Sequence, residues 1–277
     1  NSKHDLSFTS PATVRATSEN QICVFCHTPH KPNANVPLWN HGNSTQTYTF
    51  YQSNYVNTYL GFTTPAAIGS RSKLCLSCHD GTVALGSVYN LGGASGDLPM
   101  TGAGPGNVMP AGAGNLGTSL ADDHPVAYGV DTVKDTELVV PGGADAVKVY
   151  GASNEVECTS CHNAHDPQFG KFLVKDNANA AICTTCHAKV GWASAAHKTS
   201  VVSYTPPSTT TATTVGEWAC RNCHDMHTSS GTAGAPLNIY SYLLRGTEER
   251  TCFSCHGTDP GPLLTGAKNI QALLLKS

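Results

Sequence analysis

Apolar residues occur in short runs along this sequence, so long amphipathic helices and broad sheets are not expected. Valines on both sides of Pro-Gly-Gly predict a small hairpin over residues 136–151. Residues 190–200 predict a helix that carries His197, and residues 269–277 predict a short packing helix. No apolar run reaches the roughly 18 residues that a membrane span requires. The pattern therefore predicts short elements joined by much irregular chain.

Two stretches are dominated by small or hydroxyl residues. Gly, Ala and Pro prevail in residues 91–120, which we expect to be a linker or surface loop. Residues 205–216 are Thr-rich and of low complexity, and we expect a surface loop that does not pack.

Every cysteine of the chain belongs to a C-x-x-C-H motif, and six motifs account for all 12 cysteines. This motif is typical of covalent attachment of a c-type haem. Two thiols three positions apart can form thioethers to both vinyl edges of one porphyrin, and the next imidazole can bind the iron. Disulfides and zinc sites also use paired cysteines, but neither requires a histidine after every second cysteine. The pattern predicts six covalently bound haems c.

The motifs come in three pairs, and the haems are numbered one to six along the chain. The cysteines expected to bind them are Cys23, Cys26, Cys75, Cys78, Cys158, Cys161, Cys183, Cys186, Cys220, Cys223, Cys252 and Cys255. The proximal iron ligands are expected to be His27, His79, His162, His187, His224 and His256.

Six haems leave only about 46 residues for each, too few for ordinary protein cores. The chain has 27 glycines and 16 prolines, and only 39% of its residues are hydrophobic. We expect a mostly irregular fold with short helices and few strands, organised around a chain of six stacked haems and dependent on them to fold. Its expected parts are a first dihaem unit (1–90), the Gly-rich linker (91–120), a second dihaem unit (121–196) and a third (197–277).

Seven histidines remain outside the motifs, one more than six irons need as distal ligands. His30, His165 and His227 each follow the first motif of a pair by three residues, and we expect them to bind haems two, four and six. His4, His124 and His197 each precede a pair, and we expect them to bind haems one, three and five. A distal histidine from another pair or another subunit remains an alternative.

The seventh histidine, His41, is expected at the surface or beside a ligand, with displacement of His4 as the alternative. Methionine is the rival axial ligand, which would raise the potential. Met100 and Met109 lie in the Gly-rich stretch, and Met226 is too close to His224 to cross its own haem. Bis-histidine ligation is therefore favoured.

The formal net charge of −3 becomes roughly −9 once haem propionates and iron are counted, which excludes nucleic acid as an expected partner. Covalent haem attachment takes place outside the cytoplasm, so we expect an exported protein. No leader precedes Asn1, and the numbering is expected to begin at the mature protein.

Several segments resemble a known family: SKHDLSF, CVFCHTPH followed by PLWN, CLSCHDGTVA, HPVAY and SAAH. They are similar to the doubled C-x-x-C-H multihaem cytochromes of metal-reducing and related prokaryotes. Within that group, the pattern resembles outer-surface cytochromes that polymerise into extracellular filaments. The resemblance implies haems stacked in alternating parallel and T-shaped pairs, with electron transfer along the row. It also implies that a neighbouring protomer can donate a distal histidine, for which His4 and His41 are candidates.

Three functions are weighed. An electron-transfer protein, not an enzyme, is favoured, because irons with two protein ligands leave no open position for substrate. We expect an extracellular or cell-surface filament subunit with itself, redox cytochromes or extracellular acceptors as partners; a soluble periplasmic shuttle is the alternative. A multihaem reductase would need one open haem, and Asp80, Asp166 and Asp225, which follow motifs, are expected only to cap or solvate their turns. A haem-free structural or adhesive module is the third class.

Overall fold

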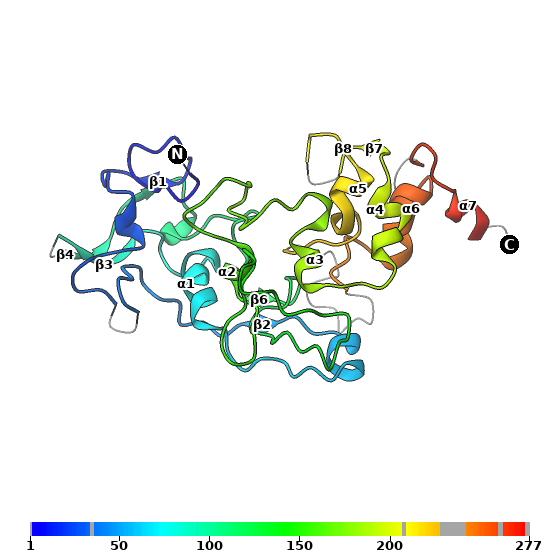
Figure 1. Ribbon diagram of the computed structural model, residues 1–277. Coiled ribbons are helices and arrows are strands. Elements are labelled where there is room, and N and C mark those ends of the chain that lie inside the picture. Colours follow the sequence, from blue (N-terminus) through cyan, green and yellow to red (C-terminus); the bar gives the residue numbers. More distant parts are fainter. Residues whose placement is uncertain are drawn as a thin grey trace. The chain divides into compact units, whose positions relative to one another are not determined.

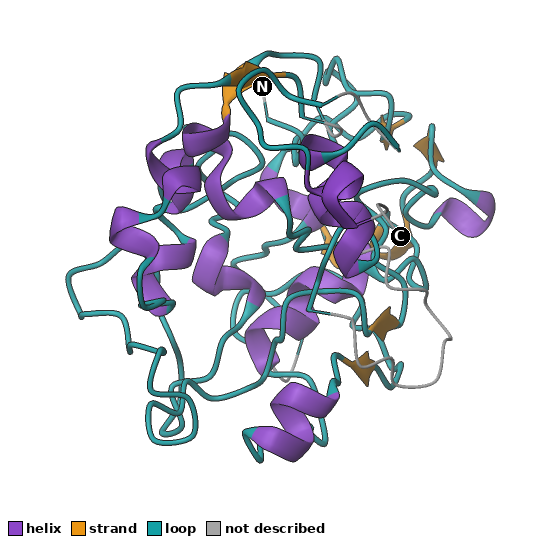
Figure 2. Cartoon of the chain, turned by 90° about the vertical axis from the view of Figure 1, so that its right-hand side faces the viewer, coloured by secondary structure: helices purple, strands orange, loops and turns teal. Residues whose placement is uncertain are grey.

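The computed structural model describes residues 2–33, 36–92, 94–206, 209–227, 242–259 and 263–274 (Figure 1). Loops trace most of the chain between short helices and very short strands (Figure 2). The predicted fold class, a mostly irregular chain with short helices and few strands, is confirmed in this respect. The chain divides into two compact units, residues 1–49 with 67–120 and residues 50–66 with 121–277.

Unit 1 contains the first pair of motifs. Its helices and strands are β1 (Arg15–Ala16), η1 (Cys23–Phe25), α1 (Ser70–His79), β3 (Ser87–Leu91), β4 (Ala94–Asp97), β5 (Met100–Thr101), η3 (Pro105–Asn107) and β6 (Ser119–Leu120). Strand β2 (Thr49–Phe50) lies where the two units join along the chain. The strands pair antiparallel, β1 with β5 through Ala16↔Met100 and β3 with β4 through Val88↔Gly96.

The apolar core of unit 1 is small. Its buried members are Ala16, Val24, Phe25, Val88 and Leu98. Val24 and Phe25 belong to the first motif itself, so the cluster packs directly beneath a predicted haem attachment. Leu98 comes from the stretch expected to be a linker, which instead carries β4 and β5. That stretch forms part of the packed unit because its strands pair with β3 and β1.

Unit 2 contains the second and third pairs of motifs. Its elements are η2 (Asn54–Tyr59), α2 (Cys158–Cys161), η4 (Ala178–Ala180), α3 (Cys183–Cys186), η5 (Trp192–Ser194), α4 (Ala196–Thr199), β7 (Ser203–Tyr204), β8 (Thr213–Thr214), α5 (Val215–Trp218), η6 (Ala219–Asn222), α6 (Glu248–His256) and α7 (Ile270–Leu274). β7 pairs antiparallel with β8.

Two of the predicted elements of unit 2 form, and two predictions fail. Helix α4 carries His197, and α7 forms beside α6. The hairpin over 136–151 is wrong, because Leu138 pairs with His187 and Val139 N donates to Cys186 O at 2.8 Å instead. The Thr-rich stretch is more ordered than expected: Pro206 is fully buried, and Thr214 caps α5 in a reciprocal bond with Glu217.

Within the described ranges, no helix is long and apolar enough to cross a membrane.

Candidate haem sites

Each C-x-x-C-H motif lies on a helical turn. The histidine amide donates to the carbonyl of the first cysteine four residues earlier, at 2.8 Å for His27, 3.0 Å for His162 and 2.8 Å for His187. Of the three remaining motifs, the second lies on α1, the sixth on α6 and the fifth at η6, where His224 N donates to Cys220 O at 3.0 Å. Residues i, i+3 and i+4 of such a turn share one face. Both thiols and the imidazole of a motif are therefore presented to the same side, as one porphyrin requires.

All twelve cysteines are free thiols, so the disulfide alternative is not realised. Burial, followed by nearby cysteines, raises the pKa of the Cys26, Cys161 and Cys223 thiols to about 11. These surroundings therefore favour the neutral thiol at the three positions, in keeping with cysteines that end as neutral thioethers.

Four of the proximal histidines have one ring nitrogen bound to a backbone carbonyl. Nδ1 lies 2.6 Å from Gly114 O in His79, 2.9 Å from Lys171 O in His162, 2.8 Å from Tyr242 O in His224 and 2.9 Å from Lys268 O in His256. A carbonyl only accepts, so Nδ1 carries the proton and Nε2 keeps its lone pair. This arrangement fixes the ring and directs Nε2 to a metal.

The strongest fit to haem comes from imidazoles that face one another in pairs. Ring centres are 6.1 Å apart for His4 and His79, 6.2 Å for His124 and His187, 6.0 Å for His162 and His227, and 5.9 Å for His197 and His256. With a metal–nitrogen bond of about 2.0 Å and a ring radius of about 1.1 Å, two imidazoles on one iron have centres about 6.2 Å apart. The four pairs leave room for one iron each.

These pairs correct the predicted assignment of distal ligands. His4, His124 and His197 face the histidines of haems two, four and six, whereas haems one, three and five were expected. His227 faces the histidine of haem three, not that of haem six. The two residues of each pair are 59 to 75 positions apart in the sequence, too far for a local spacing rule to show which motif the fold brings opposite.

His41 is not at the surface. It is fully buried, and its Nε2 lies 3.2 Å from Cys78 Sγ, at the attachment of haem two. Trp39 packs edge-on against both His41 and His27, with ring centres 6.2 Å and 6.5 Å apart. The expectation that His41 lies at the surface is wrong. Its place next to Cys78 agrees with the expectation that it lies beside a haem site.

His30 has an exposed ring on a well-fixed backbone. Its carbonyl accepts hydrogen bonds from Thr28 Oγ1 at 2.8 Å and Asn90 Nδ2 at 2.6 Å. All thirteen histidines lie within the described residues; inside unit 1 no second imidazole faces His30, and inside unit 2 none faces His224. His165 is also exposed.

The segment 122–124 was only half recognised from the sequence. His124 N donates to Met226 O at 2.8 Å, and Asp123 Oδ1 accepts from His227 Nδ1 at 2.8 Å. Burial, and then His187, lowers the pKa of His124 to about 4, which favours the neutral form that binds metal. Asp123 is not predicted from the sequence, because it follows no motif; its position directly before His124 is the signal that points to it.

A close approach of two backbones places His197. Gly216 N of α5 donates to Ser200 O at 2.9 Å, just after α4. A Cβ at position 216 would lie 2.6 Å from Lys198 O. Only glycine therefore allows α4 to come this near while His197 faces His256.

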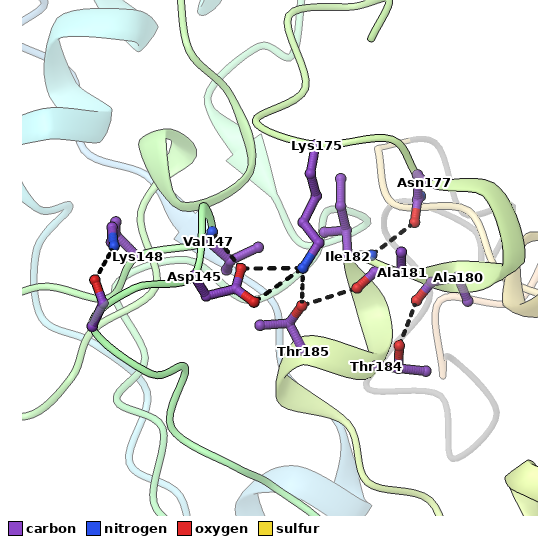
Figure 3. Close-up of polar contacts among 11 residues, drawn as sticks. Asp145, Val147, Lys148, Lys175, Asn177, Ala180, Ala181, Ile182, Thr184 and Thr185 are labelled. Carbon is purple, nitrogen blue, oxygen red and sulfur yellow. Dashed lines mark hydrogen bonds and ion pairs between the residues drawn. The ribbon is translucent and has the colours of Figure 1, made fainter.

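A network of polar side chains anchors α3, the turn that carries the fourth motif (Figure 3). Lys175 Nζ donates to both oxygens of Asp145 at 3.1 Å and to Thr185 Oγ1 at 2.9 Å. Thr185 and Thr184, the two middle residues of this motif, donate to the carbonyls of Ala181 at 2.9 Å and Ala180 at 3.0 Å. The hydroxyls thus tie the motif to the preceding turn.

The carboxylates that follow motifs hold turns, as expected. Asp80 is buried and accepts from Thr82 N at 2.8 Å and Tyr48 Oη at 2.7 Å. Asp166 accepts from Gln168 N at 2.9 Å, and Asp225 forms an ion pair with Arg245 at 2.8 Å.

Attachment thiols of successive motifs lie near one another inside each unit. A hydrogen bond with Cys183 lowers the pKa of Cys220 to about 7, so motifs four and five are in contact. Cys186 adds to the raised pKa of Cys161, and Cys252 to that of Cys223. In unit 1, Cys26 acts in the same way on Cys78. Motifs one and two, and motifs three to six, therefore follow one another in space as in sequence.

A comparison with protein families matches residues 151–191 to the doubled CXXCH motif. The match spans the second pair of motifs and supports a multihaem c-type cytochrome, a class that typically transfers electrons. No curated protein matches the chain.

Proposed function

We propose that this protein carries six covalently bound haems c with two histidines on each iron, and conducts electrons along the row as a subunit of an extracellular filament. Haem, when bound, supplies one-electron chemistry. The four facing imidazole pairs support this role, because each would fill both axial positions of one iron and leave none there for a substrate. The sequential order of neighbouring motifs supports a continuous path within each unit.

The filament proposal rests on the two histidines that remain without a facing ring. His227, of the third pair, faces His162, of the second pair, which is an offset of one repeat. If each histidine at this position of a pair binds an iron of the preceding pair, His30 has none to bind, because it belongs to the first pair. In the third pair, the iron bound by His224 receives no second histidine by this rule. Each chain is therefore left with one histidine that has no iron, His30, and one iron that lacks a second ligand, the iron of His224.

A head-to-tail contact between identical chains satisfies both. His30 of one protomer would bind the iron held by His224 in the next protomer, and the contact repeats without closing. Heterologous contacts of this kind build open helical assemblies. We expect the filament at the cell surface, with redox cytochromes or extracellular acceptors at its ends. This assignment replaces His4 and His41 as the crossing histidine, because both already have internal contacts.

The test is His30→Ala in the haem-loaded protein, with Lys31→Ala, an exposed neighbour, as matched control. We expect filaments by electron microscopy for the wild type and Lys31→Ala, and discrete particles for His30→Ala. EPR should show one high-spin ferric haem in His30→Ala alone. Discrete wild-type particles with six low-spin haems would contradict the proposal and favour a diffusing periplasmic shuttle.

A reductase with haem five open is the second candidate, because no second imidazole faces His224. It predicts a high-spin ferric signal in the wild type whatever its assembly state, and reduction of nitrite or hydroxylamine. Loss of that signal on assembly would exclude it.

A further inference from the structure

The contact between Asp123 and His227 differs in kind from those of the proximal histidines. Asp123 is only 4% exposed, and its Oδ1 accepts from His227 Nδ1 at 2.8 Å. His79, His162 and His256 donate to backbone carbonyls instead. A carboxylate is a stronger acceptor than a carbonyl, and low exposure leaves its charge weakly screened.

We propose that Asp123 is a positioning residue that gives haem three a lower reduction potential than it would have with a neutral partner. This inference rests on the proposed function, in that His162 and His227 bind one iron. A carboxylate that accepts from Nδ1 makes the imidazole a stronger electron donor through Nε2. The stronger donor stabilises ferric over ferrous iron, and the negative charge acts in the same direction.

The surrounding contacts hold this arrangement from both sides. His124 N donates to Met226 O at 2.8 Å, so segments 122–124 and 225–227 are joined at two points. Asp225 Oδ1 accepts from His227 N at 3.1 Å and fixes the backbone of the ligand. The same short segment thus adjusts haem three through Asp123 and offers His124 to the iron of haem four. An electron moving between these neighbours should meet a higher-energy site at haem three.

Ring geometry distinguishes haem three from haems two, four and six. The planes of His162 and His227 are tilted by 39°, whereas the other three pairs cross at 67° to 76°. Nearly aligned imidazole planes make the two iron dπ orbitals unequal and give a rhombic ferric EPR signal. Crossed planes leave them nearly equal and give a strongly axial signal. A redox titration followed by EPR can therefore track the rhombic component.

The test compares the haem-loaded wild type with Asp123→Asn, which keeps an acceptor oxygen but removes the charge. In Asp123→Asn we expect the ratio of ferrous to ferric iron in the rhombic haem to rise about tenfold at a given potential. This corresponds to a reduction potential about 59 mV higher. Asp122→Asn removes the same charge at the adjacent position but keeps the contact between Asp123 and His227. It should shift the reduction potential of the rhombic component much less. In the wild type, the rhombic component should have the lowest potential of the resolved ferric signals.

Different outcomes bear on the role of Asp123 and on the proposed function. An unshifted rhombic component in Asp123→Asn, with six low-spin haems intact, overturns the role of Asp123 and leaves the proposed function standing. If Asp123→Asn fails to load haem, the wild-type order of potentials decides, and a rhombic component that is not lowest overturns the inference. Fewer than six haems, or a high-spin signal in the assembled wild type, counts against the proposed function itself.

Discussion

Gly216→Ala tests how the fold delivers a distal histidine to its iron. The new Cβ would lie 2.6 Å from Lys198 O and 2.8 Å from Ser200 O, both of them backbone atoms. Ordinary contact begins at 3.4 Å, so the end of α4 must move by about 0.8 Å. His197 lies on α4, and its ring centre is 5.9 Å from that of His256. A movement of this size would displace His197 from its present position opposite His256.

Whether Gly216→Ala raises or lowers the free energy of unfolding distinguishes the effect of helix propensity from that of overpacking. Helix propensity alone predicts that alanine in α5 stabilises the protein by about 1 kcal/mol. Overpacking against a backbone costs about 1–3 kcal/mol, and loss of an iron ligand adds to it. We therefore expect a lower thermal midpoint by the Soret band, together with a high-spin ferric signal and carbon monoxide binding by the reduced protein. Gly142→Ala is the control, because its Cβ would meet no atom within 4 Å. A fully low-spin Gly216→Ala protein at least as stable as the wild type would refute this account of how His197 is held.

Two further predictions concern α3 and haem two. Lys175→Ala should cost about 0.5–1 kcal/mol, because the ion pair with Asp145 is partly exposed. The Val147 amide and Lys175 hold the folded pKa of Asp145 below its unfolded value, so this stabilisation is complete above about pH 4 and is lost as pH falls through the folded pKa. The variant should therefore unfold at a higher pH in an acid titration followed by circular dichroism; an unchanged midpoint would contradict the network in Figure 3. His4→Ala should produce one high-spin ferric haem by EPR. In a Cys75→Ala/Cys78→Ala background, which removes haem two, it should add none, and an added signal would assign His4 to another haem.

The sequence predicted features that depend on near neighbours. The i, i+3, i+4 spacing of Cys158, Cys161 and His162 already requires a helical turn, and the turn is present. Low apolar content predicted an irregular chain, which is confirmed. The number of haems, the three dihaem units and the ligand roles of the histidines stay predictions.

Features that depend on distant contacts were not predictable in this way. His4 faces His79 and His227 faces His162, across separations that no local rule orders. The hairpin over 136–151 failed for a similar reason: Leu138 had a distant partner in His187, and this pairing replaced the local one. Asp123 and Gly216 acquire their roles only when two segments meet.

The carbonyls that accept from the proximal histidines belong to the main chain of Gly114, Lys171, Tyr242 and Lys268. A main-chain acceptor is present whatever side chain the residue carries. Substitutions at these four positions can therefore change the surface of the protein, and the molecules it meets, while each imidazole keeps its tautomer and its direction. The loops after the motifs can therefore vary in sequence while the proximal imidazoles keep their backbone partners.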